Sequence, residues 1–357
     1  MSLGPIMFDL EGPELTAEER ALLAHPLVGG VILFSRNYRT PGQLSALVES
    51  IHKLREPRLL VAVDHEGGSV QRFRDAFTLL PAAMRLGEIH DRDIVRACAL
   101  AEQCGWVMAV ELRAYDVDFS FAPVLDLGKG PSRVIRSRAF HRDPTVVARL
   151  GKSFLRGAKK AGMASVGKHF PGHGAVEADS HVDVPIDTRT LETLFSRDLV
   201  PFDRMIRAGL PAVMPAHVIY PKVDEKPAGF SSVWLRSVLR GQLGFTGAIF
   251  SDDITMAGAA WAGDPIERAK SALAAGCDMV VVCNNRPGVV DILEGLGREG
   301  SDQYPDPVSA LRLARLHGHG QCHWDDLLSW DSYQKASAAV LALESEPELH
   351  LHDDRPA

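Results

Sequence analysis

The sequence lacks a membrane-spanning segment, a disulfide pattern and an obvious export signal. Its apolar runs fall well short of the ~20 residues that a transmembrane helix needs. The N-terminal stretch "MSLGPIMFDLEGPELTAEER" has no basic start followed by a long apolar core. The five cysteines are an odd number without a C-x-x-C pair, which argues against a disulfide framework. We therefore expect a protein of the reducing cytoplasm.

A strong excess of charge is also missing. The formal net charge is −7 and the isoelectric point is about 6.1, so there is no electrostatic basis for binding nucleic acid or an anionic membrane. No G-x-G-x-x-G motif follows the first predicted strand, which disfavours a dinucleotide-binding fold. The expected partner is a small molecule, and the chain is expected to act as a monomer without a cofactor.

Eight short apolar runs are present instead, and each is followed by a segment with helical periodicity. The runs occupy residues 5–10, 29–34, 59–64, 118–126, 165–170, 212–217, 247–253 and 278–283. Their continuous apolar character is typical of strands that are buried on both faces. Between them, Thr40 before Pro41 and Asp143 before Pro144 mark helix starts, and Gly276 marks a helix end.

This alternation predicts an α/β fold, a (β/α)8 TIM barrel in a single domain. We expect the barrel to span residues 1–343, followed by a polar and disordered tail at residues 344–357. An open doubly wound sheet would show a similar alternation and is the alternative fold. The connection at residues 128–144 is rich in glycine and arginine, and it is typical of a loop that reaches over a pocket.

Titratable residues gather where the predicted strands end. In a (β/α)8 barrel these carboxyl ends build the active site. The strand-end residues are Asp9, Asp64, His65, Glu66, Asp126, Lys168, His169, His217, Asp252, Asp253, Asn284 and Asn285. A rim that only turned the chain would favour Gly, Ser and Asn, whereas this rim supplies groups for acid–base or nucleophilic chemistry.

The stretch "KHFPGHGAVEADSH", residues 168–181, concentrates histidines on a segment that cannot be regular structure. His169 and His173 are four residues apart, as in helical metal-binding motifs. The Pro-Gly pair between them prevents that helix. His181 could still contribute a ligand from a loop, but the usual ligand spacings are missing, so we expect no metal.

The stretch "FSDD" ends the seventh apolar run with Asp252 and Asp253. Because side chains alternate along a strand, one of these carboxylates points into the barrel. Asp252 is favoured as a nucleophile if the strand extends that far. The alternative is that both aspartates only cap the following helix.

The triplet "DSH" places Asp179 two residues before His181 on a glycine-bounded loop. A neighbouring carboxylate can orient an imidazole and stabilise its charged form. With an unperturbed pKa of ~6.5, the imidazole can donate and accept a proton near neutrality. A weakly interacting surface pair is the alternative. Gly172 and Gly174 suggest a hinge that swings His181 over a bound substrate.

Seven stretches, spread over most of the chain from about Gly4 to Leu343, carry the sequence pattern of one protein family. They read "LAHPLVGGVILFSRNY", "VAVDHEGGSVQRF", "FAPVLDLG", "GKHFPGHGAVEADSH", "MPAHVIY", "GFTGAIFSDDITMAGA" and "AGCDMVVVCNNR". Together they resemble glycoside hydrolase family 3, in particular its single-domain bacterial β-N-acetylglucosaminidases of cell-wall recycling. The fold of that family is a (β/α)8 barrel, in agreement with the eight apolar runs.

The resemblance implies a role for several residues. Asp252, the first aspartate of "SDD", is implied as the nucleophile, and His181 assisted by Asp179 as the general acid and base. The implied sugar-binding residues are Asp64, Arg72, Arg138, Lys168 and His169, with His217 and Met256 lining the pocket. For the lysine and Arg72 the alternative is a structural ion pair with a rim acid, and for His169 a packed imidazole.

The reaction that the resemblance implies is hydrolysis with retention. The implied substrate is a muropeptide in which N-acetylglucosamine is β-1,4-linked to 1,6-anhydro-N-acetylmuramic acid. The enzyme would remove the N-acetylglucosamine through a covalent glycosyl-aspartate. Three rival activities are a phosphorylase that uses phosphate in place of water, a metal-dependent barrel hydrolase and a non-catalytic sugar-binding protein.

Two places depart from the family pattern. Arg136 and Ser137 stand before Arg138, where relatives usually have an acidic residue, so we expect a local change in the orientation of Arg138. His65 and Ser69 stand where glutamine and arginine are more common, close to the implied sugar-binding aspartate. We expect this second departure to change the affinity for the substrate.

Overall fold

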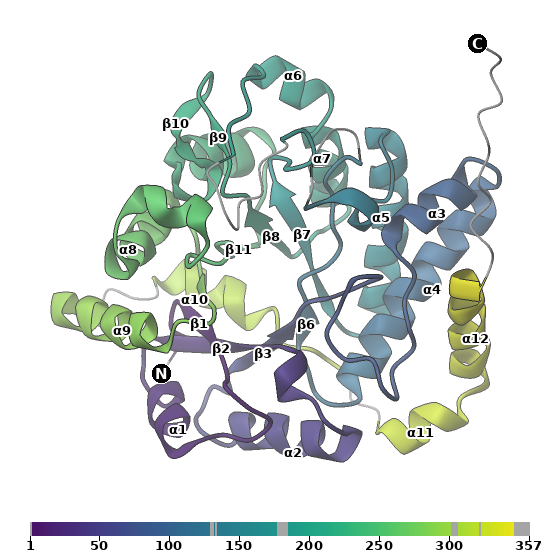
Figure 1. The fold of residues 1–357 in the computed structure, drawn as a ribbon, viewed down its shortest axis with the longest axis horizontal. Coiled ribbons are helices and arrows are strands. Elements are labelled where there is room, and N and C mark those ends of the chain that lie inside the picture. Colours follow the sequence, from purple (N-terminus) through teal and green to yellow (C-terminus); the bar gives the residue numbers. More distant parts are fainter. Residues whose placement is uncertain are drawn as a thin grey trace, which may run out of the picture.

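Eight parallel strands form a ring at the centre of the molecule (Figure 1). The structure, a computed structural model, describes residues 2–128, 132, 134–176, 185–300, 306–320 and 323–345. The strands are β1 (Ile6–Asp9), β2 (Val28–Leu33), β3 (Leu60–Val63), β6 (Phe119–Ser120), β7 (Ala164–Phe170), β8 (Ala212–Pro215), β11 (Ala248–Ile249) and β12 (Val280–Val282). Each predicted apolar run overlaps one of them, so the predicted α/β barrel is confirmed.

The ring is a curled sheet whose two edge strands meet. The strand order is β11-β8-β7-β6-β3-β2-β1-β12. A parallel bridge between Phe250 and Met279 joins the ends of the series, and the Ser251 amide donates to the Met279 carbonyl at 2.8 Å. An open doubly wound sheet is therefore excluded. Because all eight strands run in the same direction, their carboxyl ends gather on one side of the ring.

Helices follow the strands and cover the outside of the ring. Their bounds are α1 (Ala17–Leu23), α2 (Pro41–His52), α3 (Ala83–His90), α4 (Ile94–Arg113), α5 (Pro144–Lys160), α6 (Leu191–Ser196), α7 (Leu199–Arg207), the π-type helix η4 (Val233–Gln242), α8 (Pro265–Ala275) and α9 (Arg286–Gly300). The predicted start signals are confirmed, because the side chains of Thr40 and Asp143 accept hydrogen bonds from first-turn amides. Gly276 ends α8 with a φ of 125°, as predicted.

The helical segment between β7 and β8 is broken in two. Asp198 lies between α6 and α7 and is buried. Its carboxylate pairs with Arg189, whose Nη1 lies 2.6 Å from Asp198 Oδ2. This ion pair holds the chain at the break, and local helical periodicity gives no sign of it.

Shorter elements decorate the loops between strands and helices. They are the hairpin β4 (His65–Gly67) with β5 (Val70–Gln71), the hairpin β9 (Ile219–Tyr220) with β10 (Asp224–Pro227), and the single-turn helices η1 (Ser35–Asn37), η2 (Arg136–Arg138), η3 (Ala228–Phe230) and η5 (Ala257–Ala262). The β4–β5 hairpin directly follows β3 and therefore lies at the end of the ring where the titratable residues were predicted.

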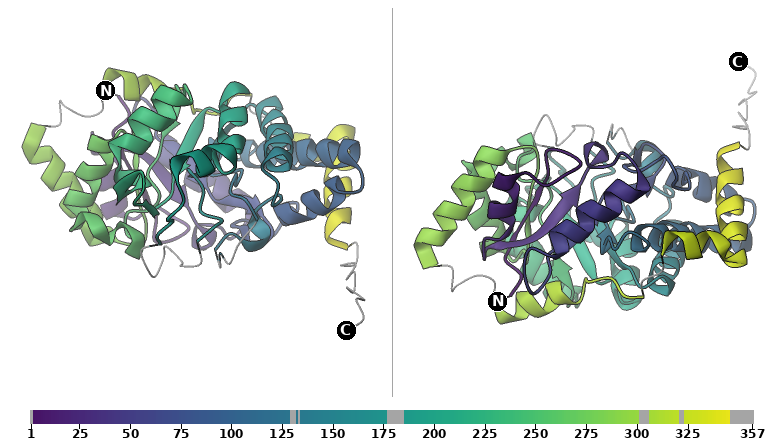
Figure 2. Two further views of the ribbon diagram at one scale, coloured as in Figure 1. Left: turned by 90° about the horizontal axis from the view of Figure 1, so that it is seen from above. Right: turned by 90° about the horizontal axis from the view of Figure 1, so that it is seen from below.

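The chain after the barrel forms three further helices, α10 (Pro307–Ala314), α11 (Trp324–Ser329) and α12 (Asp331–Ser345). Figure 2 shows α12 beside α4. The Tyr333 hydroxyl on α12 donates to the buried Glu111 carboxyl on α4 at 2.7 Å. The helix α12 continues past the predicted barrel boundary at residue 343, and residues 346–357 of the predicted tail lie outside the described residues.

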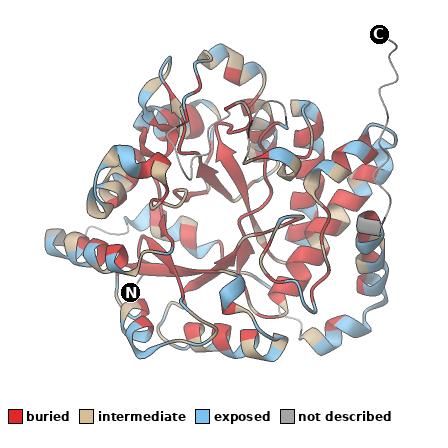
Figure 3. Cartoon of the chain, in the orientation of Figure 1, coloured by how far each residue is buried: buried red, intermediate tan, exposed pale blue. Residues whose placement is uncertain are grey.

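Aromatic side chains fill the interior of the ring. The rings of Phe119, Phe121 and Phe250 are fully buried, and their centroids are 5.3 Å apart in each pair. Figure 3 shows the strands buried and the outward faces of the helices exposed. Such close-packed aromatic cores contribute strongly to stability, and here the packing holds the strand ends in fixed positions.

The described cysteines are not cross-linked. Cys98, Cys104, Cys277 and Cys283 are free thiols, in agreement with the expected lack of a disulfide framework, and Cys322 lies outside the described residues. Burial raises the pKa of Cys277 and Cys283 well above the usual value, so both thiols stay protonated. In the part of the chain that the structure describes, no helix is both long and apolar enough to cross a membrane.

Candidate active site

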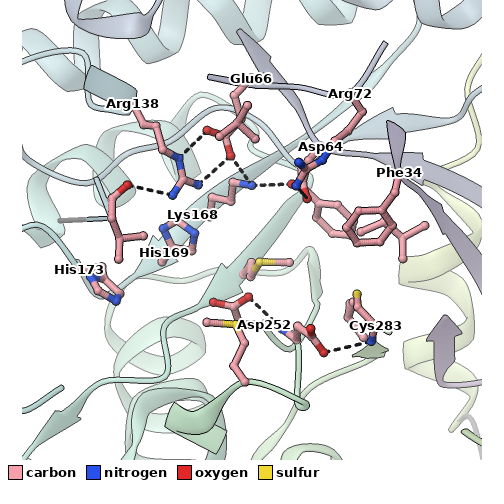
Figure 4. A pocket seen from close by; sticks show the side chains of 18 of the residues that line it. Phe34, Asp64, Glu66, Arg72, Arg138, Lys168, His169, His173, Asp252 and Cys283 are labelled. Carbon is pink, nitrogen blue, oxygen red and sulfur yellow. Dashed lines mark hydrogen bonds and ion pairs between the residues drawn. The ribbon is translucent and has the colours of Figure 1, made fainter. Parts of the chain in front are cut away.

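The carboxyl ends of the strands surround a cavity of about 270 Å³, which we call the catalytic cavity (Figure 4). Its lining includes Phe34, Asp64, Glu66, Arg72, Arg138, Lys168, His169, His173, Asp252, Asp253, Met256, Cys283 and Asn284. The tertiary structure therefore brings together residues from the ends of seven of the eight strands, all except β1, and from the long loop at 128–144. The lining is rich in charged groups, which suits a polar ligand.

Lys168 and Glu66 form the centre of a buried ion-pair network. Lys168 Nζ lies 2.8 Å from Asp64 Oδ1 and 2.6 Å from Glu66 Oε1. Arg138 donates from Nε and Nη2 to the two oxygens of Glu66, each at 2.8 Å. Figure 4 shows these three side chains converging above the cavity. Arg72 is a looser partner, with Nη2 3.5 Å from Asp64 Oδ2.

The network holds its charges firmly. Burial alone would raise the pKa of Glu66, but Lys168 and Arg138 outweigh this effect and hold the pKa far below its usual value. For Lys168, burial alone would lower the pKa, but Asp64 and Glu66 raise it above the usual value. Lys168 and Arg72 are thus paired with acidic residues of the rim, as the alternative interpretation predicted. A lysine has three N–H donors and uses two here, so a contact to a ligand is still possible.

Glu66 is the residue of this network that the sequence interpretation left without a role. It follows Asp64 by two positions in an extended segment, so the two carboxylates lie on the same side of the chain. Its bidentate contact also answers the question of Arg138. A glutamate 72 residues earlier in the chain orients Arg138, because its two oxygens hold one edge of the planar guanidinium.

Asp252 and Asp253 have different surroundings. The Asp253 amide donates to Asp252 Oδ1 at 2.8 Å, and Asp252 Oδ2 makes no hydrogen bond to the described residues. Asp253 accepts instead from the Thr255 amide, the Thr255 hydroxyl and the Cys283 amide. Asp264 caps the following helix α8, so the interpretation that the Asp pair caps this helix is wrong.

The two carboxyl groups also differ in acidity. Burial by itself would raise the pKa of both carboxyl groups. For Asp253 this effect dominates, and the pKa is raised to about 6. For Asp252 the neighbouring imidazoles of His217 and His169 and the Asp253 amide outweigh burial, and the pKa lies below its usual value. Asp252 is therefore the more acidic carboxyl group of the pair, and it has an oxygen open to the cavity.

A buried aspartate orients His169. Asp126 is almost fully buried, and its Oδ2 accepts from the His169 amide at 3.1 Å and lies 2.7 Å from His169 Nδ1. Its Oδ1 accepts from the His173 amide at 2.6 Å. This contact puts the Nδ1 proton of His169 toward Asp126 and leaves Nε2 for the cavity. Asp126 was expected at this strand end without a stated role, and its role here is to fix two neighbouring residues.

His217 and Met256 were both expected to line the pocket, and the structure separates them. Met256 is part of the described lining, whereas His217 is not. His217 is fully buried behind the Asp253 backbone, with Nε2 3.0 Å from the Asp253 carbonyl oxygen. It stacks on Phe230 with a centroid distance of 5.3 Å. The expectation for His217 is corrected accordingly, because alternation along the strand end turns this side chain away from the cavity.

The implied acid–base pair, His181 and Asp179, lies outside the described residues. The segment before it is closely packed. Gly172 has a φ of 144° with the Asp198 side chain against it, and a side chain at Gly174 would collide with the Leu127 carbonyl. Close packing therefore accounts for both glycines without a hinge, so alanine substitutions there cannot test the hinge hypothesis.

His65 faces away from the catalytic cavity. Its imidazole is fully buried against Phe73 and Phe77, at centroid distances of 5.9 and 5.6 Å. Neither ring nitrogen has a hydrogen-bond partner among the described residues. Burial, assisted by Arg74 and Arg72, lowers the pKa of His65 to about 3. No contact seen here supports the expected effect of this residue on substrate affinity.

The buried imidazole predicts a loss of stability in acid. His65 stays neutral in the folded state but binds a proton in the unfolded state below pH ~6.5, so its contribution falls as the pH decreases toward 3. Between pH 6.5 and pH 5 we expect the free energy of unfolding to fall about 2 kcal/mol less in His65→Phe than in the wild type. Urea unfolding at several pH values measures this difference. The exposed His319→Gln variant should follow the wild type, and equal acid losses in all three proteins would contradict the prediction.

The described residues contain no group of three or more His, Cys, Asp or Glu side chains arranged to hold a metal ion. In the catalytic cavity, Glu66 is bound by Lys168 and Arg138. Asp126 lies behind the cavity and is bound by the His169 side chain and by two backbone amides. The groups that this part of the chain offers to a ligand are a lysine, arginines, an imidazole and the carboxylates of Asp64 and Asp252. These groups are suited to the hydroxyl and carbonyl oxygens of a sugar.

Comparison with known proteins places the chain in a family. Residues 6–307 match the glycosyl hydrolase family 3 N terminal domain. A protein named Beta-hexosaminidase from Thioalkalivibrio sulfidiphilus is 57% identical over 351 residues, covering 98% of this chain and 99% of the relative. A second Beta-hexosaminidase, from Thiobacillus denitrificans, is 60% identical over 319 residues, covering 89% of this chain and 88% of the relative.

A solved structure shares the fold over nearly the whole chain. NagZ from Neisseria gonorrhoeae, in complex with N-trifluoroacetyl-D-glucosamine, superimposes with a TM-score of 0.90 at 46% identity, covering 96% of this chain and 98% of that chain. The predicted class of enzyme, a glycoside hydrolase, is confirmed by the family match. The barrel, the charged cavity at its carboxyl ends and these similarities agree: the chain belongs to glycosyl hydrolase family 3.

Proposed function

We propose that the protein is a retaining exo-β-N-acetylglucosaminidase that removes β-1,4-linked N-acetylglucosamine from 1,6-anhydro-N-acetylmuramyl peptides in cytoplasmic cell-wall recycling. The names of the similar proteins, Beta-hexosaminidase and NagZ, support the class of substrate. The observation that carries the proposal is the open oxygen of the ionised Asp252, which faces the cavity opposite the cations held by Glu66. The muropeptide and the recycling role follow from the sequence resemblance.

Asp252 is proposed as the nucleophile. Its open oxygen attacks the anomeric carbon as the glycosidic bond breaks, which gives a covalent glycosyl-aspartate and avoids a free oxocarbenium ion. The low pKa keeps this carboxylate ionised at the pH of the cytoplasm. Asp253 is the poorer candidate, because its two oxygens already accept three hydrogen bonds, whereas Asp252 accepts one.

The sugar is proposed to lie under the ion-pair network. Asp64 can accept from two hydroxyl groups, and Lys168, Arg138, Arg72 and His169 can donate to hydroxyl or carbonyl oxygens. These donors are paired with buried carboxylates before any ligand binds, so they lose little freedom when the sugar arrives. Such preorganised contacts make the attack by Asp252 nearly unimolecular.

A proton donor is needed for the leaving oxygen. Glu66, another carboxylate of the lining, is held ionised by Lys168 and Arg138 and is a poor acid. We assign this role to His181 with Asp179 on the basis of the family resemblance, since the pair lies outside the described residues. The imidazole first protonates the leaving oxygen and then removes a proton from the water that hydrolyses the glycosyl-aspartate.

The proposal predicts hydrolysis and not phosphorolysis. Incubation of the purified protein with 4-nitrophenyl N-acetyl-β-glucosaminide should release free N-acetylglucosamine, with the β-anomer formed first in proton NMR spectra. Added phosphate, at concentrations from about 0.5 mM to about 50 mM, should leave the product unchanged, because water attacks the intermediate. Formation of N-acetylglucosamine 1-phosphate would favour the phosphorylase instead. Absence of any turnover would favour a sugar-binding protein, and loss of activity after exhaustive chelation a metal-dependent hydrolase.

A further inference from the structure

A second cavity opens beside the catalytic cavity. It has a volume of about 390 Å³ and is lined by Asp9, Glu11, Arg36, Asn284, Asn285 and Arg286; we call it the side cavity. Asn284 lines both cavities. The guanidinium carbon of Arg36 lies 4.7 Å from the ring centroid of Phe34, which belongs to the catalytic cavity. The two cavities are therefore neighbours that share a wall.

The order of the strands places the side cavity next to the reacting end of the sugar. The groups proposed to hold the sugar hydroxyls come mainly from the ends of β3 and β7, and Asp252 follows β11. The side-cavity residues follow β12, β1 and β2, which come after β11 around the ring. With the sugar hydroxyls toward Asp64 and Lys168, the leaving group departs from the face of the anomeric carbon opposite Asp252. Two sides of the ring then remain over which it can extend, β8 and the arc β12-β1-β2, and the side cavity lies on the second.

The side cavity offers more hydrogen-bond donors than acceptors. Arg286 Nη2 donates to the Asp9 carbonyl and to Glu19 Oε1, each at 3.0 Å. The Nε and Nη1 atoms of the same guanidinium are buried without a hydrogen-bond partner among the described residues, with the Glu11 carboxylate 3.9 Å from Nε. Because both atoms are buried, a ligand oxygen reaches this edge of the guanidinium only when the Glu11 or Arg286 side chain shifts, and such a contact would satisfy donors that are otherwise costly to bury.

The asparagines add to these donors. Asn285 Oδ1 accepts from the Gly288 amide at 3.0 Å, so its NH2 group is left to donate. Asn284 is exposed at the junction of the cavities, in a left-handed backbone conformation with a φ of 54°. The backbone amide of Asn284 donates to Asp9 Oδ1 at 3.0 Å. Asp9 also forms an ion pair with Arg36. The Asp9 carboxylate is therefore already bound and does not compete with a ligand for the free donors of the side cavity.

The donors in the side cavity are suited to the oxygens of a peptide. Acidic side chains balance the charges of Arg36 and Arg286, so the cavity does not attract anions at long range and acts through directed N–H groups. Carbonyl and carboxylate oxygens are the acceptors that asparagine and arginine side chains bind best. A 4-nitrophenyl group has no carbonyl or carboxylate oxygen, and its nitro oxygens are weaker acceptors.

We propose that the side cavity binds the leaving group of the glycoside, and that Asn285 and Arg286 recognise peptide carbonyl or carboxylate oxygens on it. This inference rests on the proposed function, since only a glycosidase has a leaving group to bind. It assigns the preference for a peptide-bearing substrate to residues after β12, which belong to neither the nucleophile nor the sugar-binding network.

The test compares two substrates in one set of variants. One is 4-nitrophenyl N-acetyl-β-glucosaminide, and the other is N-acetylglucosaminyl-1,6-anhydro-N-acetylmuramyl tripeptide. Asn285→Asp keeps the acceptor for Gly288 but replaces the NH2 donors by an oxygen. We expect it to lower the kcat/KM ratio of the peptide substrate to the aryl substrate at least tenfold. Glu11→Gln removes a competing carboxylate, and the ratio should stay at the wild-type value or rise.

A matched control is available at the exposed C-terminal end of helix η4. Gln242→Glu makes the same amide-to-carboxylate change outside both cavities, and it should keep the wild-type ratio. An equal loss on both substrates in Asn285→Asp, or an unchanged ratio, would overturn the inference. A changed preference for N-acetyl over longer N-acyl groups at a constant leaving group would assign the side cavity to the acyl group and would also overturn it.

A binding measurement separates failure of this inference from failure of the proposed function. The free 1,6-anhydro-N-acetylmuramyl tripeptide is titrated into the wild type and Asn285→Asp by calorimetry. Binding to the wild type that weakens at least tenfold in the variant supports the side cavity whether or not turnover is seen. If the wild type hydrolyses the aryl substrate but does not bind the tripeptide, the side-cavity assignment is wrong while the proposed glycosidase stands.

Discussion

Asp252→Asn lowers kcat/KM for an aryl N-acetylglucosaminide by at least about a thousandfold, if this carboxylate is the nucleophile. The reason is that asparagine keeps the shape and the hydrogen bond from the Asp253 amide but cannot form the glycosyl-aspartate. Losses of about this size or larger are usual when a covalent nucleophile is removed. Initial rates over a range of substrate concentrations measure the effect.

The neighbouring aspartate supplies a matched control for this result. Asp253→Asn makes the same change one residue away, at a carboxyl group whose pKa is raised to about 6 and whose oxygens hold Thr255 and Cys283. Its main effect should be a lower melting temperature, because one of its three donors loses its acceptor. Comparable losses of kcat in the two variants would show that the pair acts through structure and would contradict a special role for Asp252.

Two further readouts identify the nucleophile directly. A 5-fluoro-N-acetylglucosaminyl donor should leave a sugar on the peptide that contains Asp252, as seen by mass spectrometry after proteolysis. In Asp252→Ala, added azide should restore part of the activity and appear in the product as a glycosyl azide, because the small anion takes the place of the missing carboxylate. A label on any other residue would refute the assignment.

Glu66→Gln is expected to have the second-largest effect, on both stability and substrate binding. Glu66 neutralises Lys168 and Arg138 in a buried site, and removing one charge of a buried network costs about 3–5 kcal/mol. The two cations also lose the group that orients them. We therefore expect KM to rise at least tenfold while kcat changes less, as measured by urea unfolding and by steady-state kinetics on the folded variant.

Glu111→Gln is a suitable control for this prediction. Glu111 is also buried, but burial raises its pKa to about 7 despite the hydrogen bonds from Thr78 and Tyr333. It can therefore be protonated near neutral pH without a cation beside it, and glutamine resembles that neutral form. We expect a stability loss of about 1 kcal/mol or less and an unchanged KM. Equal losses of stability in both variants, with an unchanged KM in both, would show that the role of Glu66 is only structural.

The contrast between Glu66 and Glu111 has a functional meaning. Both carboxyl groups are buried, yet one is held ionised by two cations and the other is brought close to neutrality by burial. At Glu66 the cations remain oriented toward a cavity, where a ligand can use their remaining donors. At Glu111 the partners are a threonine and a tyrosine that join α4 to the C-terminal helix α12. The first arrangement serves binding, and the second fastens the end of the chain to the barrel.

Local rules were sufficient for much of the site. Continuous apolar runs identify the strands, and a strand buried on both faces leaves its polar residues at its ends. Asp64, Lys168 and Asp252 could therefore be placed at the rim from the sequence, and the structure brings them to the lining of one cavity. The cap residues Thr40 and Asp143 could be recognised for the same reason, since a helix start depends on groups within one turn.

The sequence by itself determined the barrel, the family and the set of residues at the rim, because these depend on periodicity and on short local motifs. Only the tertiary structure decided that Glu66 binds Arg138 and Lys168, that His217 lies behind Asp253 and that His65 turns away from the cavity. For Glu66 and His217 the physical reason is that the partners lie 72 and 36 residues apart in the sequence. Closure of the ring and the paths of the loops select them, and no local pattern encodes that choice.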